Sequence, residues 1–211
     1  IGGIGPVTGS TAVYGNAVKN GAEFAIAEIN ALGGQQYEMK FEDDENDAEK
    51  AINAYNSLKD WGMQLSLGSV TSKPGEATSV ENYADRIFAL TPSASSQATT
   101  EGKDNVFQMC FMDPNQGTAA ARYIDEQDLG TKIAVIWKND DVYSKGIHDT
   151  FVEEAANQGL EVVYEGTFTG DTATDFSVQL TGAQSAGADL VFMPIYYTPA
   201  SLILNQAKTM G

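Results

Sequence analysis

Short apolar runs alternate with amphipathic segments along the first half of the chain. The apolar runs predict strands at residues 1–5, 37–41, 64–68, 87–90 and 106–111, and the amphipathic segments predict helices at residues 16–32, 47–61 and 76–85. In the first of these helices, Val18, Ala22, Ala25, Ile26 and Ile29 recur at helical spacing. Glycines 33–34 and 62 supply stop signals.

The alternation restarts after residues 113–117. Strands are predicted at 132–137, 160–165 and 189–193, with helices at 117–127, 146–158, 176–185 and 199–210. Strands that alternate with helices predict parallel sheets with right-handed crossovers. We therefore expect an α/β fold of two lobes, each a mostly parallel sheet flanked by helices: an N-terminal ligand-binding lobe at residues 1–115 and a C-terminal lobe at 116–211. The chain stops where another strand is due, so we expect the last part of the fold to be missing and the fragment to be capable of self-association.

Two hydroxyl-rich segments, residues 71–75 and 91–96, follow predicted strands and read as loops. Ligands of open parallel sheets bind beyond the carboxyl ends of the strands. Hydroxyl groups and exposed backbone N–H groups there suit a carboxylate without requiring a full positive charge. The sequence therefore predicts a binding site for a small acid.

Charge and composition exclude several classes of protein. The 211 residues carry 12 basic and 29 acidic side chains, a net charge of −17, which disfavours nucleic acid and anionic membrane surfaces as partners. No apolar stretch approaches the roughly 18 residues of a membrane span, so this segment is not expected to insert into one. Cys110, the only cysteine, lies in an apolar run and is expected to be a buried, inert thiol.

Catalytic, metal and nucleotide motifs find little support. His148 is the only histidine, so neither a Ser-His-Asp nor a Cys-His arrangement is indicated and zinc is disfavoured; we expect no enzyme, no metal and no cofactor. The glycines at residues 5–10 match no nucleotide-binding motif. The acidic run 42–47 lacks the glycine and the distal glutamate of a calcium loop and is better explained as a solvated helix start.

Three tyrosines, Tyr14, Tyr143 and Tyr196, each fall in a predicted loop after a strand. An aromatic ring with a polar tip is suited to facing a ligand. Ordinary loop packing explains any one of them equally well. Taken together with the hydroxyl loops, they are expected to converge on one cleft.

A set of short motifs occurs in order along the whole chain: Gly5-Pro6-x-Thr8-Gly9, Tyr14-Gly15, Asn20-Gly21-Ala22-Glu23, Glu28-Ile29-Asn30-Ala31-x-Gly33-Gly34, Asp43-Asp44-x-x-Asp47, Thr91-Pro92-Ser93-Ala94, Asp113-x-x-Gln116-Gly117, Tyr143-Ser144-x-Gly146, and Gly170-Asp171 with Asp175-Phe176-Ser177. With these motifs the sequence resembles the branched-chain amino-acid-binding (leucine/isoleucine/valine-binding) family of periplasmic ABC-transporter solute receptors. That family has the type I periplasmic-binding-protein fold.

The resemblance implies a two-lobed clamp that closes on a free amino acid, is extracytoplasmic and delivers its ligand to an ABC permease. It places the α-carboxylate at Ser72, Ser93 and Ser95 and the α-ammonium at Asp113. Asp113 also suits the N-cap of helix 117–127, and both roles can hold at once. Tyr14, Tyr143 and Tyr196 match positions that line or close the cleft. A second acidic partner of the ammonium, which the family takes from a later segment, is not in this chain.

Two other functions remain open from the sequence. The same clamp can serve as the ligand-sensing domain of a membrane receptor or chemoreceptor, and an α/β hydrolase or transferase is the third choice. Lys73, beside the first hydroxyl segment, either recognises an acidic ligand side chain or is an ordinary surface lysine.

Overall fold

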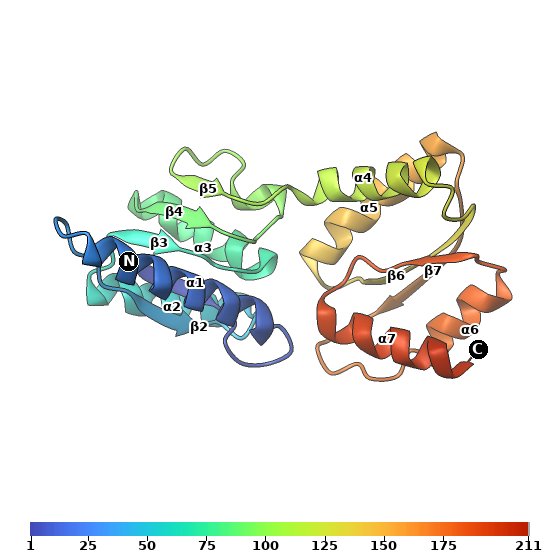
Figure 1. The fold of residues 1–211 in the computed structure, drawn as a ribbon, viewed down its shortest axis with the longest axis horizontal. Helices are drawn as coiled ribbons and strands as arrows, with labels where there is room; N and C mark the ends of the chain where they lie inside the picture. Colours follow the sequence, from blue (N-terminus) through green and yellow to red (C-terminus); the bar gives the residue numbers. More distant parts are fainter. Residues whose placement is uncertain (211) are drawn as a thin grey trace. The chain divides into compact units, whose positions relative to one another are not determined.

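The computed structural model describes residues 1–210, and the chain divides into two compact units, unit 1 (Ile1–Phe111) and unit 2 (Met112–Gly211). Helix α4 (Asp113–Glu126) opens unit 2 (Figure 1). The division expected from the sequence, between residues 115 and 116, falls inside this helix. The helix begins four residues earlier than predicted because Pro114 occupies its first turn, where the missing N–H costs no hydrogen bond.

Unit 1 contains a parallel sheet of five strands in the order β2-β1-β3-β4-β5. The strands are β1 (Gly2–Gly5), β2 (Lys40–Asp43), β3 (Leu65–Leu67), β4 (Phe88–Thr91) and β5 (Val106–Gln108). Strand β2 begins later than expected, because the backbone N–H of Tyr37 donates to the Asn30 side chain at 2.8 Å and the ladder with β1 starts only at Lys40. The strand order reverses between β1 and β3, which is where such sheets bind ligands.

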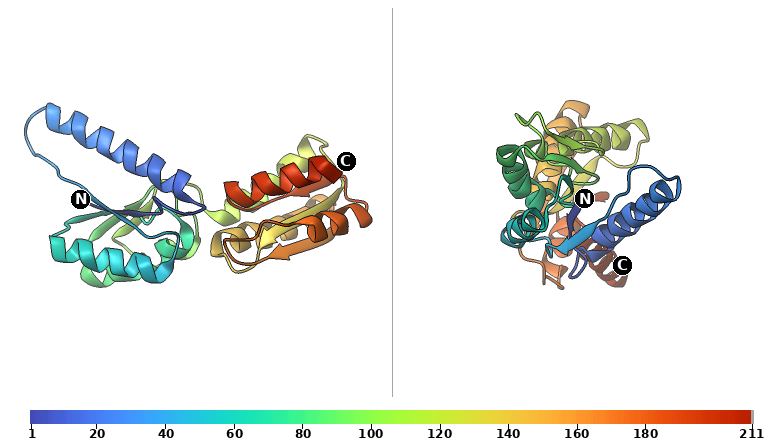
Figure 2. Two further views of the ribbon diagram at one scale, coloured as in Figure 1. Left: turned by 90° about the horizontal axis from the view of Figure 1, so that it is seen from below. Right: turned by 90° about the vertical axis from the view of Figure 1, so that its left-hand side faces the viewer.

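Helices cover both faces of this sheet. Helix α1 (Ala12–Ala31) lies on one face, and α2 (Ala48–Trp61) and α3 (Ser72–Asp85) lie on the other (Figure 2). Asp47 caps α2 by accepting from Glu49 N and Lys50 N. Gly62 ends the helix in the left-handed conformation, as the sequence predicted. The buried face of α2 packs against Ile4 of β1 and forms the core of unit 1, with Ala51, Ala54, Tyr55, Leu58 and Met63.

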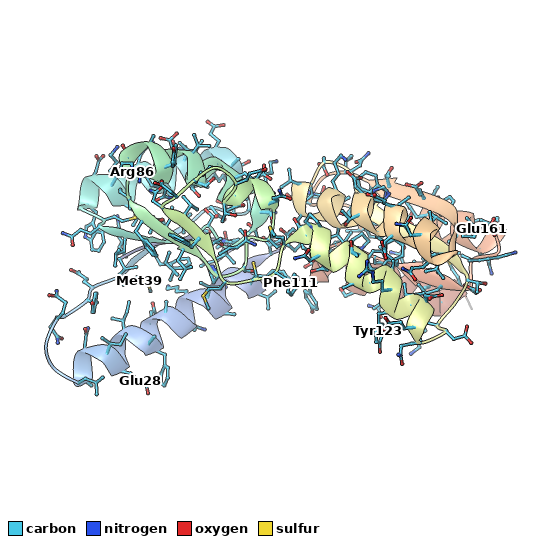
Figure 3. The ribbon with its side chains drawn as sticks, turned by 90° about the horizontal axis from the view of Figure 1, so that it is seen from above. Glu28, Met39, Arg86, Phe111, Tyr123 and Glu161 are labelled. Atoms are coloured by element: carbon cyan, nitrogen blue, oxygen red, sulfur yellow. The ribbon has the colours of Figure 1, made fainter. Side chains whose placement is uncertain are left out.

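Helix α1 is far more exposed than its sequence pattern suggested. Of its residues only Gly15 is buried, and none of the five apolar positions that recur at helical spacing is. Phe24 is 66% exposed. Figure 3 labels Glu28 near the outer end of α1 and Met39 on the connection that returns to the sheet. The apolar periodicity correctly indicated a helix, but nothing in the described part of unit 1 covers its apolar side.

Unit 2 contains a parallel sheet in the order β7-β6-β8, made by β6 (Lys132–Lys138), β7 (Glu161–Phe168) and β8 (Leu190–Phe192). On one face, α4 and α5 (Val142–Gln158) pack against Ile133 and Val135. On the other, α6 (Ser177–Ser185) and α7 (Tyr197–Met210) pack against Ile136. Neighbouring residues of β6 thus pack into the cores on opposite faces of the sheet, as expected for a strand that is buried on both faces.

The described parts confirm the predicted α/β fold with parallel sheets flanked by helices. A search of residues 1–210 finds no helix with both the length and the apolar character to cross a membrane.

Candidate functional site

The hydroxyl-rich segment 71–75 is the first turn of α3 and not the loop that the sequence suggested. Helix α3 starts at Ser72, and its first helical hydrogen bond joins Gly75 N to Thr71 O at 2.9 Å. Pro74 and Gly75 favoured a turn, yet a proline is tolerated in a first helical turn because the N–H it lacks would have no helical partner there. Ser72 is buried and Lys73 is exposed.

The Ser72 hydroxyl joins α3 to the segment after β4. Its Oγ accepts hydrogen bonds from Ser95 N at 3.1 Å and from Ser96 N at 3.2 Å. A serine hydroxyl has two lone pairs and one proton. Because both lone pairs are occupied by backbone donors, the remaining hydrogen-bonding capacity of Ser72 is its proton. The group is therefore configured to donate to an anionic or carbonyl oxygen.

The segment 91–96 is held by a second hydroxyl. Thr91 Oγ1 donates to Ser69 O at 2.7 Å and accepts from Ala94 N at 2.9 Å and, more weakly, from Ser93 N at 3.4 Å. The structure thus brings Ser72 and Ser95 together, with Ser95 buried. The side chain of Ser93 is exposed. These contacts fix the backbone of residues 92–96, which the sequence correctly left without a strand or an α-helix.

Glu76, a residue that the sequence reasoning missed, also supports this segment. Ser96 Oγ donates to Glu76 Oε1 at 2.5 Å. Glu76 lies four residues after Ser72, which places both on the same face of α3. Once the helix is known to start at Ser72, the spacing reveals this pairing; with residues 71–75 taken as a loop, it could not be seen.

The remaining candidate of unit 1, Tyr14, lies in the first turns of α1, whereas the sequence placed it in a loop. The helix begins early because Gly15, whose absent Cβ would come within 1.9 Å of Pro6 O, lets α1 approach the loop after β1. Cys110 is half-buried, not buried as expected, and its Sγ lies 3.4 Å from Ala94 O.

The acidic run also departs from expectation, because its members have different environments. Asp43 accepts hydrogen bonds from Val7 N at 2.9 Å and Thr8 Oγ1 at 2.5 Å, and so anchors the loop after β1. Hydrogen bonds of this kind hold the pKa of Asp43 below its usual range despite partial burial. Asp44, expected to be solvated, is fully buried.

In unit 2, Asp113 is the first residue of α4 and is buried, with 1% of its surface exposed. Met112, and not Asp113, is the N-cap residue, so the proposed capping role is wrong; Asp113 lies inside the first turn, where the helix dipole favours a carboxylate. Gly146 of α5 faces it: a Cβ there would come within 3.0 Å of Asp113 Cβ. A glycine at this position allows α5 to pass close to the carboxyl group.

Tyr143 and Tyr196 stack on each other, with ring centroids 4.7 Å apart and planes at 17°. Tyr143 is in the first turn of α5, which Asp141 caps by accepting from Ser144 N at 3.1 Å; the sequence had this helix begin only at Gly146. Tyr196 directly precedes α7. The two rings come from the segments after β6 and β8, where the strand order of unit 2 reverses. The structure brings Tyr143 and Tyr196 together, and the convergence of all three tyrosines with the hydroxyl segments on one cleft stays a prediction.

A buried lysine that the sequence did not single out lies at the same edge. Lys138 ends β6, and its Nζ lies 2.9 Å from Asp171 Oδ1 and 3.5 Å from Asp140 Oδ1. Although burial opposes a charged amine, these carboxylates raise the pKa of Lys138. The amine therefore joins the segments that follow β6 and β7.

The His148 ring contacts three neighbouring side chains of unit 2. Its ring stacks on Trp137 at 4.0 Å, and its two nitrogens lie 2.7 Å from Glu165 Oε2 and 2.9 Å from Asp149 Oδ1.

Comparison with known proteins identifies the family that matches this chain and proteins of similar sequence. The model of the family described as "Periplasmic binding protein" matches residues 1–211. A Leu/Ile/Val-binding protein homolog of Brucella melitensis is 34% identical over 100% of this chain and 58% of its own length. The leucine-, isoleucine-, valine-, threonine- and alanine-binding protein of Pseudomonas aeruginosa is 31% identical over 98% of this chain and 56% of its own length.

Two solved structures are similar in fold to this chain. The branched-chain amino acid transporter substrate binding protein LivJ of Streptococcus pneumoniae, solved in complex with isoleucine, superposes with a TM-score of 0.92 at 31% identity. It matches 100% of this chain and 60% of LivJ. A solute binding protein from Rhodopseudomonas palustris in complex with benzoate has a TM-score of 0.89 at 21% identity and shares the fold. The chain spans less than two thirds of the length of these proteins.

Proposed function

This chain belongs to the periplasmic binding protein family, and we propose that it binds a free amino acid, branched-chain or related, and delivers it to an ABC permease without altering it chemically. The relatives named for leucine, isoleucine and valine support this ligand class. The proposal includes an extracytoplasmic location, which follows from the family and from the role of such receptors.

The ligand carboxylate is assigned to unit 1. The observation that carries this assignment is the Ser72 hydroxyl, whose Oγ accepts two backbone N–H groups and whose proton is left to donate. Ser95 and the segment at Ser93 supply neighbouring donors. Neutral donors suit the carboxylate of an amino acid, because binding it then requires no cation to be desolvated.

The rest of the ligand is assigned to unit 2 and Tyr14. Asp113 binds the ammonium group, since a buried carboxylate forms charge-assisted hydrogen bonds of roughly twice the ordinary strength. Tyr143 and Tyr196, which form a stacked pair, contact the side chain of the ligand, as does Tyr14. These assignments are proposals for the whole protein.

Calorimetric titration of the full-length protein tests the ligand class with three related compounds. L-Leucine carries both charged groups, leucinamide lacks the carboxylate, and 4-methylpentanoate lacks the ammonium. We expect binding of L-leucine, with both analogues weakened by at least about tenfold, or roughly 1.4 kcal/mol. Equal binding of leucine and 4-methylpentanoate would point to a simple carboxylic acid as ligand and would remove Asp113 from its assigned role.

The same titration with Ser72→Ala locates the carboxylate. The variant should bind L-leucine more weakly than the parent protein and should lose less affinity for leucinamide, because the hydroxyl proton forms a stronger hydrogen bond with a charged carboxylate than with an amide carbonyl. Lys73→Ala is the control on the adjacent exposed position and should leave both affinities unchanged. A full screen of the amino acids by thermal shift, with no stabilisation by any of them, would contradict the proposed function.

A further inference from the structure

A buried amine lies at the carboxyl edge of the unit 2 sheet and has no role in the proposed ligand site. Lys138 is the last residue of β6, and only 9% of its surface is exposed. Its Nζ lies 2.9 Å from Asp171 Oδ1, in the segment after β7, and 3.5 Å from Asp140 Oδ1, in the segment after β6. A lysine is rarely buried unless its charge is paired in this way.

Backbone groups connect the same two segments. The ladder between β6 and β7 continues to Lys138 and Phe168, so the segments that follow leave the sheet side by side. Beyond it, Asn139 N donates to Phe168 O at 3.2 Å. Asp140 Oδ2 accepts from Gly170 N at 3.0 Å, and the same carboxylate contacts the amine. The amine therefore takes part in a closed set of contacts between residues 138–140 and 168–171.

The segment after β6 is also the turn that contains Tyr143. Asp141 N donates to Lys138 O at 3.3 Å, and Lys138 N donates to Ser144 Oγ at 2.8 Å. Ser144 N in turn donates to Asp141 Oδ1 at 3.1 Å. All three residues are buried. Tyr143 lies between two of them, so its place in the stack with Tyr196 depends on this turn.

The charge of Lys138 balances the acids of the turn. Burial alone would lower the pKa of Lys138, but the carboxylates of Asp171, Asp141 and Asp140 raise it, so the amine is charged. Burial raises the pKa of Asp141, and the Lys138 charge acts in the opposite direction and favours the ionised form that caps α5. Without the amine, the three carboxylates would repel one another across the turn.

We propose that Lys138 is a positioning residue of the ligand site: its amine ties the segment after β7 to the turn before α5 and so holds Tyr143 where it contacts the side chain of the ligand. The inference rests on the proposed function for the ligand, but not for the effect of Lys138 on the tyrosine pair. Loss of the amine should leave the fold in place, because neither apolar core of unit 2 includes Lys138 or its partners.

Fluorine nuclear magnetic resonance tests the positioning without any ligand. The whole protein is labelled with 3-fluorotyrosine, and each signal is assigned from the matching tyrosine-to-phenylalanine variant. Lys138→Met keeps an unbranched side chain but removes the charge. In this variant the signals of Tyr143 and Tyr196 should shift, while that of Tyr164 in β7 should stay in place. A shift of all three would indicate general loosening of unit 2 and would overturn the positioning role.

Two further variants control this measurement. Lys145→Met removes an exposed lysine of α5 that pairs with Asp149 on the surface, and it should keep the signals of the parent protein. Asp171→Asn removes the closest partner of the amine at an exposed position, and it should shift the same two tyrosine signals. This variant also provides a test if Lys138→Met fails to fold. Unchanged tyrosine signals in the folded variants of this pair would overturn the proposal.

The consequence for binding is measured by titration with L-leucine. Lys138→Met should raise the dissociation constant of the parent protein at least about threefold, but that of Tyr143→Ala by less than about 1.5-fold, because the amine acts through the ring that this variant lacks. Equal increases in both proteins would overturn the positioning role. If the fluorine signals respond as expected but no amino acid binds to the parent protein, the positioning holds and the proposed function fails.

Discussion

The carboxyl ends of the two sheets present different chemistry. In unit 1 the candidate groups are hydroxyls and backbone amides, connected by hydrogen bonds through Ser72 and Thr91. In unit 2 they are a stacked pair of tyrosines, a buried carboxyl at Asp113 and an amine at Lys138 beside carboxylates. Both units are parallel α/β layers, so the difference lies in the segments that leave the ends of their strands.

The two sets of groups suit different parts of an amino acid. Neutral donors on a hydrogen-bonded backbone fix geometry and can hold an anion with little desolvation cost. Aromatic rings and a carboxylate supply apolar contact and opposite charge. We infer that unit 1 recognises the carboxylate, which every amino acid shares, and that unit 2 recognises the ammonium and contributes to the choice of side chain. Four experiments test this comparison.

The largest expected effect is an opposite response of the two units to acid. Burial raises the pKa of Asp44 of unit 1 from 3.8 to about 7, so the group takes up protons on folding and the free energy of unfolding should fall as pH rises through this window. The full change amounts to about 4 kcal/mol. Asp44→Asn should abolish it, which denaturant unfolding at several pH values would measure. Parallel pH profiles for Asp44→Asn and the parent protein would show that folding does not shift the pKa of Asp44.

Glu154 of unit 2 provides the contrasting case. The Arg122 guanidinium, 2.6 Å away, and two amide side chains lower its pKa from 4.5 to about 2. Its stabilising contribution is therefore complete above pH 4.5 and is lost as pH falls towards 2. Glu154→Gln should reduce this loss of stability in acid. It should not alter the decrease in the free energy of unfolding that Asp44 causes as pH rises towards neutral.

The next largest effect is expected at Asp113. Asp113→Asn removes the negative charge in nearly the same volume and should weaken L-leucine binding by about 3 kcal/mol, the upper range for hydrogen bonds to charged groups. Binding of 4-methylpentanoate, which has no ammonium, should not weaken. Titration calorimetry with both compounds distinguishes charge recognition from damage to α4, because damage would weaken both.

Ser72→Ala tests the carboxylate side and should cost about 2 kcal/mol in L-leucine binding. The variant loses the donor to the ligand and also leaves the Ser95 and Ser96 amides without their acceptor. Ser95→Ala should have an effect in the same direction. An unchanged dissociation constant in Ser72→Ala would end the assignment of unit 1 to the carboxylate.

The smallest effect concerns the aromatic pair. Tyr143→Ala should weaken L-leucine binding by about 1 kcal/mol, the range of one aromatic contact, while Tyr143→Phe retains the stacking on Tyr196 and most of the affinity. A set of ligands of increasing side-chain size, measured on both variants, would show whether this pair selects the side chain. An identical loss for every ligand would remove it from that role.

Much of the fold could be predicted from the sequence, because strands and helices leave regular apolar patterns. The parallel sheets and the glycine that ends α2 were correctly predicted from the sequence, and the family was correctly predicted from the resemblance that the motifs carry. The starts of α1, α3, α4 and α5 were placed too late, since glycines and prolines in their first turns favour loops locally. These helix starts carry Tyr14, Ser72, Asp113 and Tyr143, so the errors fell on the candidate site.

The sequence by itself determined which residue types come after the strands, and with them the chemistry of the candidate site: hydroxyls after β3 and β4, tyrosines after β6 and β8. Only the tertiary structure decided their partners. Ser72 meets the Ser95 and Ser96 amides more than twenty residues away, and Asp44, one of a run of acids, is buried while Asp43 is hydrogen-bonded at the surface. The local pattern of apolar and polar residues indicates whether a residue prefers contact with water and whether it favours a helix. Burial, proton order and hydrogen-bond partners depend on segments that come together only when the sheet forms.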